Sequence, residues 1–137
     1  MTEKYDLHSH STISDGMLSP TELVVRASEQ GVTALALTDH DTTAGYEEAA
    51  AAAVKTKIQL IGGIELSASW KGMTFHIVGL GINPHYTPLV EATRHLQAVR
   101  LERAEKISAK LEKKHITGAL EAVLDSAGDR MITRSHF

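Results

Sequence analysis

Residues 32–37, Val-Thr-Ala-Leu-Ala-Leu, form a nearly unbroken apolar run that sharply limits the possible folds. Such a run is typical of a strand buried on both faces, as in parallel sheets covered by helices. Just before it, Ser19-Pro20-Thr21-Glu22 has the capping-box pattern with proline at the first helical position, and Gly31 lies where a left-handed helix end is expected. We therefore expect a helix from about Pro20 to Gln30 that leads into a buried strand.

The alternation of strand and helix extends in both directions along the chain. Residues 43–55 include five consecutive alanines and favour a second helix, and residues 58–61 favour another strand. With a strand at the N-terminus that includes residues 6–10, the order becomes βαβαβ. This order predicts an α/β fold with a parallel sheet.

Residues 64–80 are expected to form an antiparallel hairpin. Gly62-Gly63 permits a sharp change of direction before a strand from Ile64 to Trp70, and Lys71-Gly72 is a plausible tight turn into a strand from Met73 to Leu80. One face of the hairpin is apolar and is expected to belong to the core: Ile64, Leu66, Ala68, Trp70, Phe75 and Ile77.

After prolines 84 and 88 the chain becomes more polar. We expect a helix from about Leu89 to Lys113 with one modest apolar stripe, and a second from about Ala119 to Ala127 that ends at Gly128. The two helices could form a hairpin that caps the sheet layer.

Composition excludes several kinds of site and partner. The 137 residues include no cysteine, so disulfides and thiolate metal sites are excluded, and any metal must have nitrogen and oxygen ligands. The formal net charge of −3 gives no long-range attraction to nucleic acid or to an anionic membrane. No apolar run resembles a signal peptide or reaches membrane length, so we expect a cytoplasmic protein with no membrane or duplex DNA partner.

Histidines and carboxylates gather near the ends of the predicted strands. The two-residue period of a strand places His8 and His10 on one face, where two imidazoles can converge on one divalent ion. If the hairpin turn has two residues, Ser67 lies opposite His76, which puts His76 diagonal to Glu65. The polar residues of these segments are, in chain order, Asp6, His8, His10, Asp15, Asp39, His40, Asp41, Glu65 and His76.

A carboxylate among neutral imidazoles at strand ends suits a multinuclear hydrolytic site, since parallel barrels build their active sites at those ends. Glu65 can bridge two ions, and a trapped water can become hydroxide near neutral pH. The sequence has no nucleophile elbow and no Walker-type phosphate loop, so the expected nucleophile is water.

These segments resemble the motifs of the PHP (polymerase and histidinol phosphatase) superfamily of metal-dependent phosphoesterases. Residues 6–11 with Ser14-Asp15-Gly16 look like its first motif, Thr38-Asp39-His40-Asp41 like its second, and Gly63-Ile64-Glu65 with His76 like its third. The resemblance implies the N-terminal part of a distorted (β/α)7 TIM-like barrel with a helical insertion. The implied organisation is a barrel core over residues 1–83, the insertion over 84–130 and the start of a return to the barrel over 131–137.

The resemblance also implies a role for each site residue and a cofactor of two or three divalent ions, drawn from manganese, iron, zinc and magnesium. The implied ligand sets are His8, His10 and Glu65 for one ion, Glu65 and His76 for a second, and Asp15 with His40 for a third. The groups implied to support these ligands from behind are Asp6, Asp39 and Asp41.

The helical segment followed by residues 132–137 is similar to a bacterial subgroup that removes the 3′-phosphate from 3′,5′-bisphosphate nucleotides and trims short RNA from the 5′ end. A phosphorylated small molecule or short RNA is therefore the implied substrate. Arg134 and His136 would contact its phosphate or leaving oxygen, and Arg100 and Arg103 are weaker candidates for the same task. The residues implied in catalysis are Asp15, Glu65 and His136.

Other functions stay open at this point. A complete barrel of this kind needs at least about 200 residues, so these residues could form a noncatalytic metal-binding fragment, and an open half-barrel predicts self-association. Amidohydrolase barrels also use a His-x-His strand, which leaves C–N hydrolysis as an alternative. Asp15, the segment Thr38–Asp41 and the segment Arg134–His136 favour phosphate esters instead.

Overall fold

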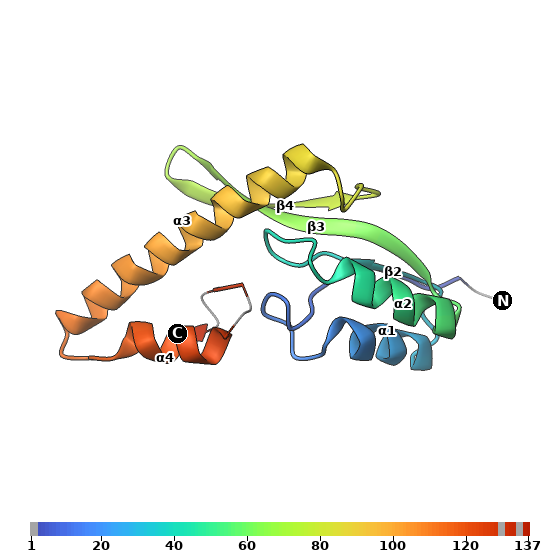
Figure 1. Ribbon diagram of the computed structural model, residues 1–137, viewed down its shortest axis with the longest axis horizontal. Coiled ribbons are helices and arrows are strands. Elements are labelled where there is room, and N and C mark those ends of the chain that lie inside the picture. Colours follow the sequence, from blue (N-terminus) through green and yellow to red (C-terminus); the bar gives the residue numbers. More distant parts are fainter. Residues whose placement is uncertain (1–2, 129–130, 134–135) are drawn as a thin grey trace.

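A computed structural model describes residues 3–128, 131–133 and 136–137 of the chain (Figure 1). The elements in order are β1 (Tyr5–Ser9), α1 (Pro20–Glu29), β2 (Ala34–Leu37), α2 (Tyr46–Thr56), β3 (Gln59–Trp70), β4 (Met73–Leu80), α3 (Thr87–Glu112) and α4 (Ala119–Ala127). The sheet order is β1-β2-β3-β4, with β1, β2 and β3 parallel and β4 antiparallel to β3. The predicted βαβαβ order and parallel sheet are confirmed.

Helix α1 begins and ends as its sequence predicts. The Ser19 hydroxyl accepts a hydrogen bond from the Glu22 amide at 3.2 Å, and the Glu22 carboxylate accepts one from the Ser19 amide at 2.8 Å. After the helix, Gly31 has a φ of +74°, the left-handed conformation that glycine adopts at least cost. The capping box and the glycine together direct the chain into β2, all four residues of which are buried.

The hydrophobic core lies where α1 and α2 pack against the parallel strands, on one side of the sheet (Figure 1). Ala49, Ala52 and Ala53 of α2 are buried there. Small side chains at these positions let α2 approach α1 and the sheet closely. The other buried apolar residues of this cluster are Val24, Ala27, Val32, Leu35, Leu37 and Ile58.

The chain does not change direction at Gly62-Gly63, contrary to expectation, because β3 runs through both glycines as one strand of 12 residues. These glycines instead allow close approach of neighbouring chain segments. A Cβ atom on Gly62 would lie 2.6 Å from the carbonyl oxygen of Ile82, and one on Gly63 would lie 2.7 Å from Cγ2 of Thr38. At this point β3 exchanges its pairing with β2 for pairing with β4.

The β3–β4 hairpin has the predicted two-residue turn and register. Lys71 and Gly72 both have positive φ, +48° and +78°, which is the signature of a type I′ turn. Ser67 therefore pairs with His76.

The apolar face of the hairpin is buried only at its base, so the prediction that it all belongs to the core is wrong. Ile64 is 1% exposed, whereas Trp70 is 66%, Phe75 43% and Ile77 56% exposed. The reason is that α1 and α2 cover the parallel strands, and no element of the described chain covers the outer part of the hairpin.

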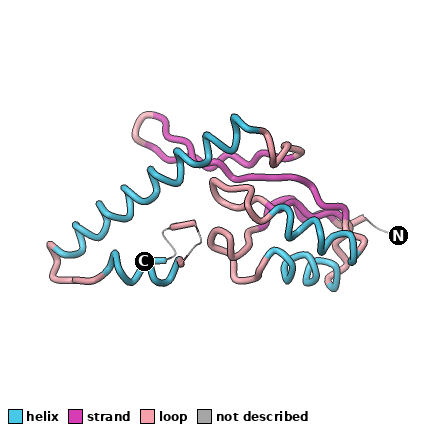
Figure 2. The backbone as a smooth tube through the Cα atoms, in the orientation of Figure 1, coloured by secondary structure: helices cyan, strands magenta, loops and turns pink. Residues whose placement is uncertain are grey.

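Helices α3 and α4 form at the predicted positions, and Gly128 ends α4 with a positive φ of 55°. They pack on each other, and Ala104 of α3 and Val123 of α4 are both almost fully buried. Helix α3 begins beside the β3–β4 hairpin and then runs with α4 away from the parallel strands, so the pair does not cap the sheet layer as expected (Figure 2). The apolar stripe of α3 is too short to cover a sheet face, since most of the helix is polar and exposed. Within the described ranges, no helix is both long and apolar enough to cross a bilayer.

Candidate metal centre

The polar residues predicted to bind metal lie together at the C-terminal ends of the parallel strands and on the adjoining hairpin. His8 lies on β1, His40 follows β2, and Glu65 and His76 face each other diagonally on β3 and β4. His40 also forms an isolated parallel bridge with Glu65, which extends the pairing of β2 and β3 beyond the strand end. The structure brings together all six of the predicted ligands, His8, His10, Asp15, His40, Glu65 and His76.

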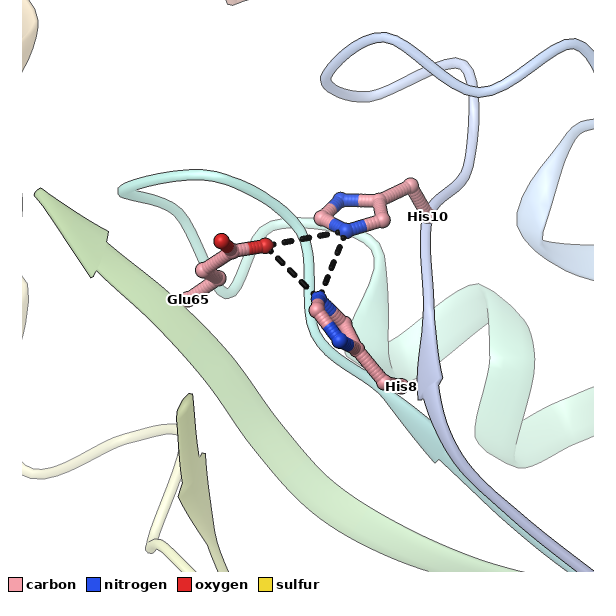
Figure 3. A group of neighbouring side chains, drawn as sticks. All are labelled: His8, His10 and Glu65. Atoms are coloured by element: carbon pink, nitrogen blue, oxygen red, sulfur yellow. Dashed lines mark hydrogen bonds and ion pairs between the residues drawn. The ribbon is translucent and has the colours of Figure 1, made fainter. Parts of the chain in front are cut away.

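His8, His10 and Glu65 form the tightest group (Figure 3). Oε2 of Glu65 lies 2.8 Å from Nε2 of His8 and 3.0 Å from Nε2 of His10, and the two ring nitrogens are 3.1 Å apart. Ligand atoms around a tetrahedral ion with bonds of about 2.1 Å are separated by about 3.4 Å. The three atoms are therefore slightly closer than such an ion would hold them, and small side-chain rotations would open the site.

Two further groups share members with the first. His40 Nε2 lies 3.5 Å from Asp15 Oδ2, and His10 Nδ1 lies 3.7 Å from Asp15 Oδ1. On the other side, Oε1 of Glu65 lies 2.9 Å from Nδ1 of His76, and Oε2 lies 3.7 Å from Nδ1 of His40. The two oxygens of Glu65 thus face different histidines, which is the arrangement of a carboxylate that bridges neighbouring ions.

Two buried ring nitrogens support occupancy of these groups by cations. Nδ1 of His10 and Nδ1 of His40 are buried and have no hydrogen-bond partner among the described residues. An orphaned buried nitrogen is unfavourable unless an ion or water satisfies it. The donor set of imidazole nitrogens and carboxylate oxygens fits manganese, iron and zinc, with magnesium favoured where oxygens predominate.

The protonation states also favour a cation. Burial lowers the pKa of His40, although Asp15 and Glu65 oppose the shift, so this imidazole is neutral near pH 7 as a metal ligand must be. Burial raises the pKa of Glu65, but the hydrogen bond from His8 and the other histidines around the carboxylate outweigh this effect, and the net shift is downward. Glu65 is therefore an ionised carboxylate.

Asp39 lies behind the site and holds the loop that carries Asp15. Its buried carboxylate accepts hydrogen bonds from the amide and hydroxyl of Ser11 and from the hydroxyl of Ser14. Burial raises the pKa of Asp39, and these hydrogen bonds oppose the rise. The loop is tightly closed, because a Cβ atom on Gly16 would lie 2.2 Å from the carbonyl oxygen of His10.

The other two predicted supporting residues differ from each other. Asp6 is exposed, and its carboxylate lies 3.4 Å from the amide of His8 and not against an imidazole ring. Asp41 is fully buried and accepts hydrogen bonds from the amide and hydroxyl of Ser67, at 2.7 and 2.8 Å. It also forms a 2.6 Å ion pair with Arg100.

The candidate substrate residues fall into three groups. Arg103 borders a cavity of about 320 Å³ that also reaches Asp15, His40 and His76. Arg100 borders the same cavity, but its side chain is only 14% exposed. Nδ1 of His136 accepts a hydrogen bond from the Thr133 amide at 3.0 Å, and Arg134 lies outside the described residues.

Sequence reasoning missed several residues that support the site. Thr38 joins the ends of β1 and β2, since its hydroxyl accepts a hydrogen bond from the Ser9 amide and donates one to the Ser9 carbonyl. The sequence motif includes Ser11 and Ser14, and the hairpin register includes Ser67, but neither pattern predicts the hydrogen bonds that these serines form. A signal existed for Ser67, because it lies two residues after Glu65 on the same strand face.

Comparison with known proteins agrees with this geometry. The PHP domain matches residues 6–130. The chain is 48% identical, over its whole length and 50% of the relative's, to a 5′-3′ exoribonuclease of Haemophilus influenzae. It is 45% identical, over 96% of its length and 47% of the relative's, to a 3′,5′-nucleoside bisphosphate phosphatase of Chromobacterium violaceum.

The fold agrees as well. A solved structure of an amidohydrolase from Chromobacterium violaceum, with bound sulfate and no metal, superposes with a TM-score of 0.90 at 44% identity, over 97% of this chain and 47% of that one. The chain spans about half the length of the curated relatives it matches. Its motifs, its curled sheet and its cluster of histidines and carboxylates are those of the N-terminal part of a TIM-like barrel, and the chain belongs to the PHP domain family.

Proposed function

We propose that this chain carries the metal centre of a phosphoesterase that acts on phosphorylated nucleotides or on the 5′ ends of short RNA. The observation that supports the proposal best is the position of Glu65. Its two carboxylate oxygens face His8 and His10 on one side and His76 on the other, within 3.0 Å in each case. A shared carboxylate of this kind is typical of sites that hold neighbouring divalent ions.

In this proposal two or three ions of manganese, iron, zinc or magnesium bind to the chain. His8, His10 and Glu65 hold one, Glu65 and His76 a second, and Asp15 with His40 a third. Such ions lower the pKa of a bound water and offset the negative charge of a phosphate group. Asp39 keeps the Asp15 loop closed through Ser11 and Ser14, so that these ligands are preorganised.

Substrate would enter the cavity beside His40 and His76. Its border includes Thr74 and Arg103, whose hydroxyl and guanidinium can donate hydrogen bonds to phosphate oxygens. We propose that Arg134 and His136 contact the same phosphate and that His136 hydrogen-bonds the leaving oxygen. We also propose residues 84–130 as an insertion between a barrel core, residues 1–83, and a returning segment that begins at residue 131.

The names of the relatives support nucleotide or RNA substrates, since they include a nucleoside bisphosphate phosphatase and an exoribonuclease. Only 4% of the residues are aromatic, so these 137 residues offer few side chains on which successive bases could stack. Recognition would then depend on phosphate and on one or two bases, which favours short substrates.

C–N bond hydrolysis is the second candidate, because a similar solved structure is named an amidohydrolase. The sulfate in that structure is a tetrahedral anion with the shape of a phosphate group, which favours phosphate esters.

The test uses the protein as its organism makes it. Bound metal is counted by mass spectrometry, and release of inorganic phosphate from a 3′,5′-bisphosphate nucleotide is compared with ammonia release from amides. We expect at least two ions per chain, phosphate release only, and loss of both metal and turnover in Glu65→Gln. Glu47→Gln, the same change at an exposed carboxylate that pairs with His85, is the matched control and should keep both. Metal binding without turnover would instead favour the alternative of a noncatalytic metal-binding fragment.

A further inference from the structure

Asp41 is a buried carboxylate at the junction of three parts of the molecule. It directly follows His40, has a φ of +51° and is fully buried. Its amide donates a hydrogen bond to the Glu65 carbonyl at 3.0 Å, and the Glu65 amide donates one to the Asp39 carbonyl at 3.1 Å. The backbone around His40 is thereby fixed to the backbone of Glu65.

The side chain of Asp41 extends the same connection to the hairpin. It accepts the amide and the hydroxyl of Ser67, and Ser67 is paired with His76 across the β3–β4 ladder. One carboxylate therefore fixes the relative positions of the segments that carry His40, Glu65 and His76.

Helix α3 holds this carboxylate through Arg100. Nε of Arg100 donates to Asp41 Oδ2 at 2.6 Å, one terminal nitrogen donates to the Ser67 hydroxyl at 2.9 Å, and the other donates to the Ile132 carbonyl at 3.2 Å. All three guanidinium nitrogens thus have protein partners. One turn earlier on the helix, the side-chain amide of Gln97 donates a hydrogen bond to the backbone carbonyl of Asp41 at 3.3 Å.

We propose that Arg100 is a positioning residue that couples helix α3 to the metal centre through Asp41, and not a residue that binds substrate. Its hydrogen bond to the Ile132 carbonyl also holds the residue before Thr133, which borders the cavity. The inference rests on the proposed function for its kinetic consequences, but the coupling itself is a property of the fold. The coupling requires the planar guanidinium of arginine, because the single ammonium of a lysine cannot reach Asp41, Ser67 and Ile132 at once.

The test is a double-mutant cycle in the naturally made protein, with the variants Arg100→Gln, Asp41→Asn and both together. We expect each single change to lower kcat on a 3′,5′-bisphosphate nucleotide by about 10- to 100-fold, with KM within about threefold, and the double variant to be no worse than the single ones. Arg100→Lys keeps the charge and most of the packing, and it should behave like Arg100→Gln. The matched control Arg103→Gln, one turn along α3, should be additive with Asp41→Asn.

Amide hydrogen exchange provides a readout that does not need activity. The Ser67 amide, which donates to Asp41, should exchange faster in Arg100→Lys than in the parent protein, at equal thermal stability or after correction for it. A rise in KM of about tenfold or more with unchanged kcat, additive with Asp41→Asn and with no change at Ser67, would show that Arg100 binds substrate and would overturn the proposal. If the parent protein has no phosphoesterase activity, the proposal can still be tested: unchanged exchange of the Ser67 amide in Arg100→Lys would overturn it.

Discussion

The carboxylate of Asp39 accepts two hydrogen bonds from Ser11, one from its amide and one from its hydroxyl, each at 2.7 Å. The Ser14 hydroxyl adds a third at 2.6 Å. All three residues are buried, so replacing one carboxylate oxygen with an NH2 group sets a donor against a serine donor where water cannot easily compensate. We expect Asp39→Asn to lower the free energy of unfolding by about 2–4 kcal/mol, measured by urea denaturation. Asp6→Asn, on an exposed strand residue, should change it by less than about 0.5 kcal/mol; equal effects would contradict the role of Asp39.

Two histidines on neighbouring segments provide a matched pair for the metal centre. His76 lies 2.9 Å from Glu65, whereas His85 forms an exposed ion pair with Glu47. We expect His76→Ala to reduce bound metal and to lower kcat/KM by about 100-fold or more, because an ion would lose a direct ligand. His85→Ala should leave metal content and kcat/KM unchanged. Retention of full metal content in His76→Ala would remove this residue from the ligand set.

Gly63 is a sensitive position in the strand that carries Glu65. In Gly63→Ala the new Cβ atom would meet Thr38 Cγ2 at 2.7 Å and the Leu37 carbonyl oxygen at 2.8 Å, so β2 and β3 must move apart. We expect a loss of about 1–3 kcal/mol in the free energy of unfolding. Gly31→Asn is the control, since Gly31 has open space around it and asparagine tolerates its positive φ. Its cost should stay under about 1 kcal/mol. No difference between the two variants would contradict the close-approach explanation.

The exposed apolar face of the hairpin predicts association when residues 1–137 are produced alone. Trp70, Met73, Phe75 and Ile77 are each more than 40% exposed on it. A contiguous apolar surface of this kind favours self-association. Light scattering after size exclusion should detect dimers or larger species, and Phe75→Ser with Ile77→Ser should shift them toward monomer. Val54→Ser, at an exposed position on α2, should not. A monomer at all concentrations would contradict the prediction.

The register of the hairpin shows what the sequence can predict. A two-residue turn at Lys71-Gly72 and the two-residue period of a strand are both local properties, and together they place His76 near Glu65. The capping box at Ser19 and the glycine at position 31 were predictable for the same reason.

The glycine pair at 62–63 shows what the sequence cannot predict. Glycine permits both a turn and a close contact, and the choice is made by Ile82 and Thr38, which are distant in sequence. Asp41, the carboxylate that pairs with Arg100, is likewise 59 residues away along the chain, so no local pattern predicts the pair. The exposure of Trp70 depends on which element covers the hairpin, and no local pattern carries that information.

The centre also joins segments of very different separation along the chain, which sets the order in which it can assemble during folding. Glu65 and His76 are 11 residues apart within one hairpin, whereas Glu65 and His8 are 57 residues apart. Short loops close faster than long ones, and parallel pairing must wait for the intervening helices. A nascent chain that has formed only its hairpin already has Glu65 beside His76, and the docking of β1 is the step that adds His8 and His10.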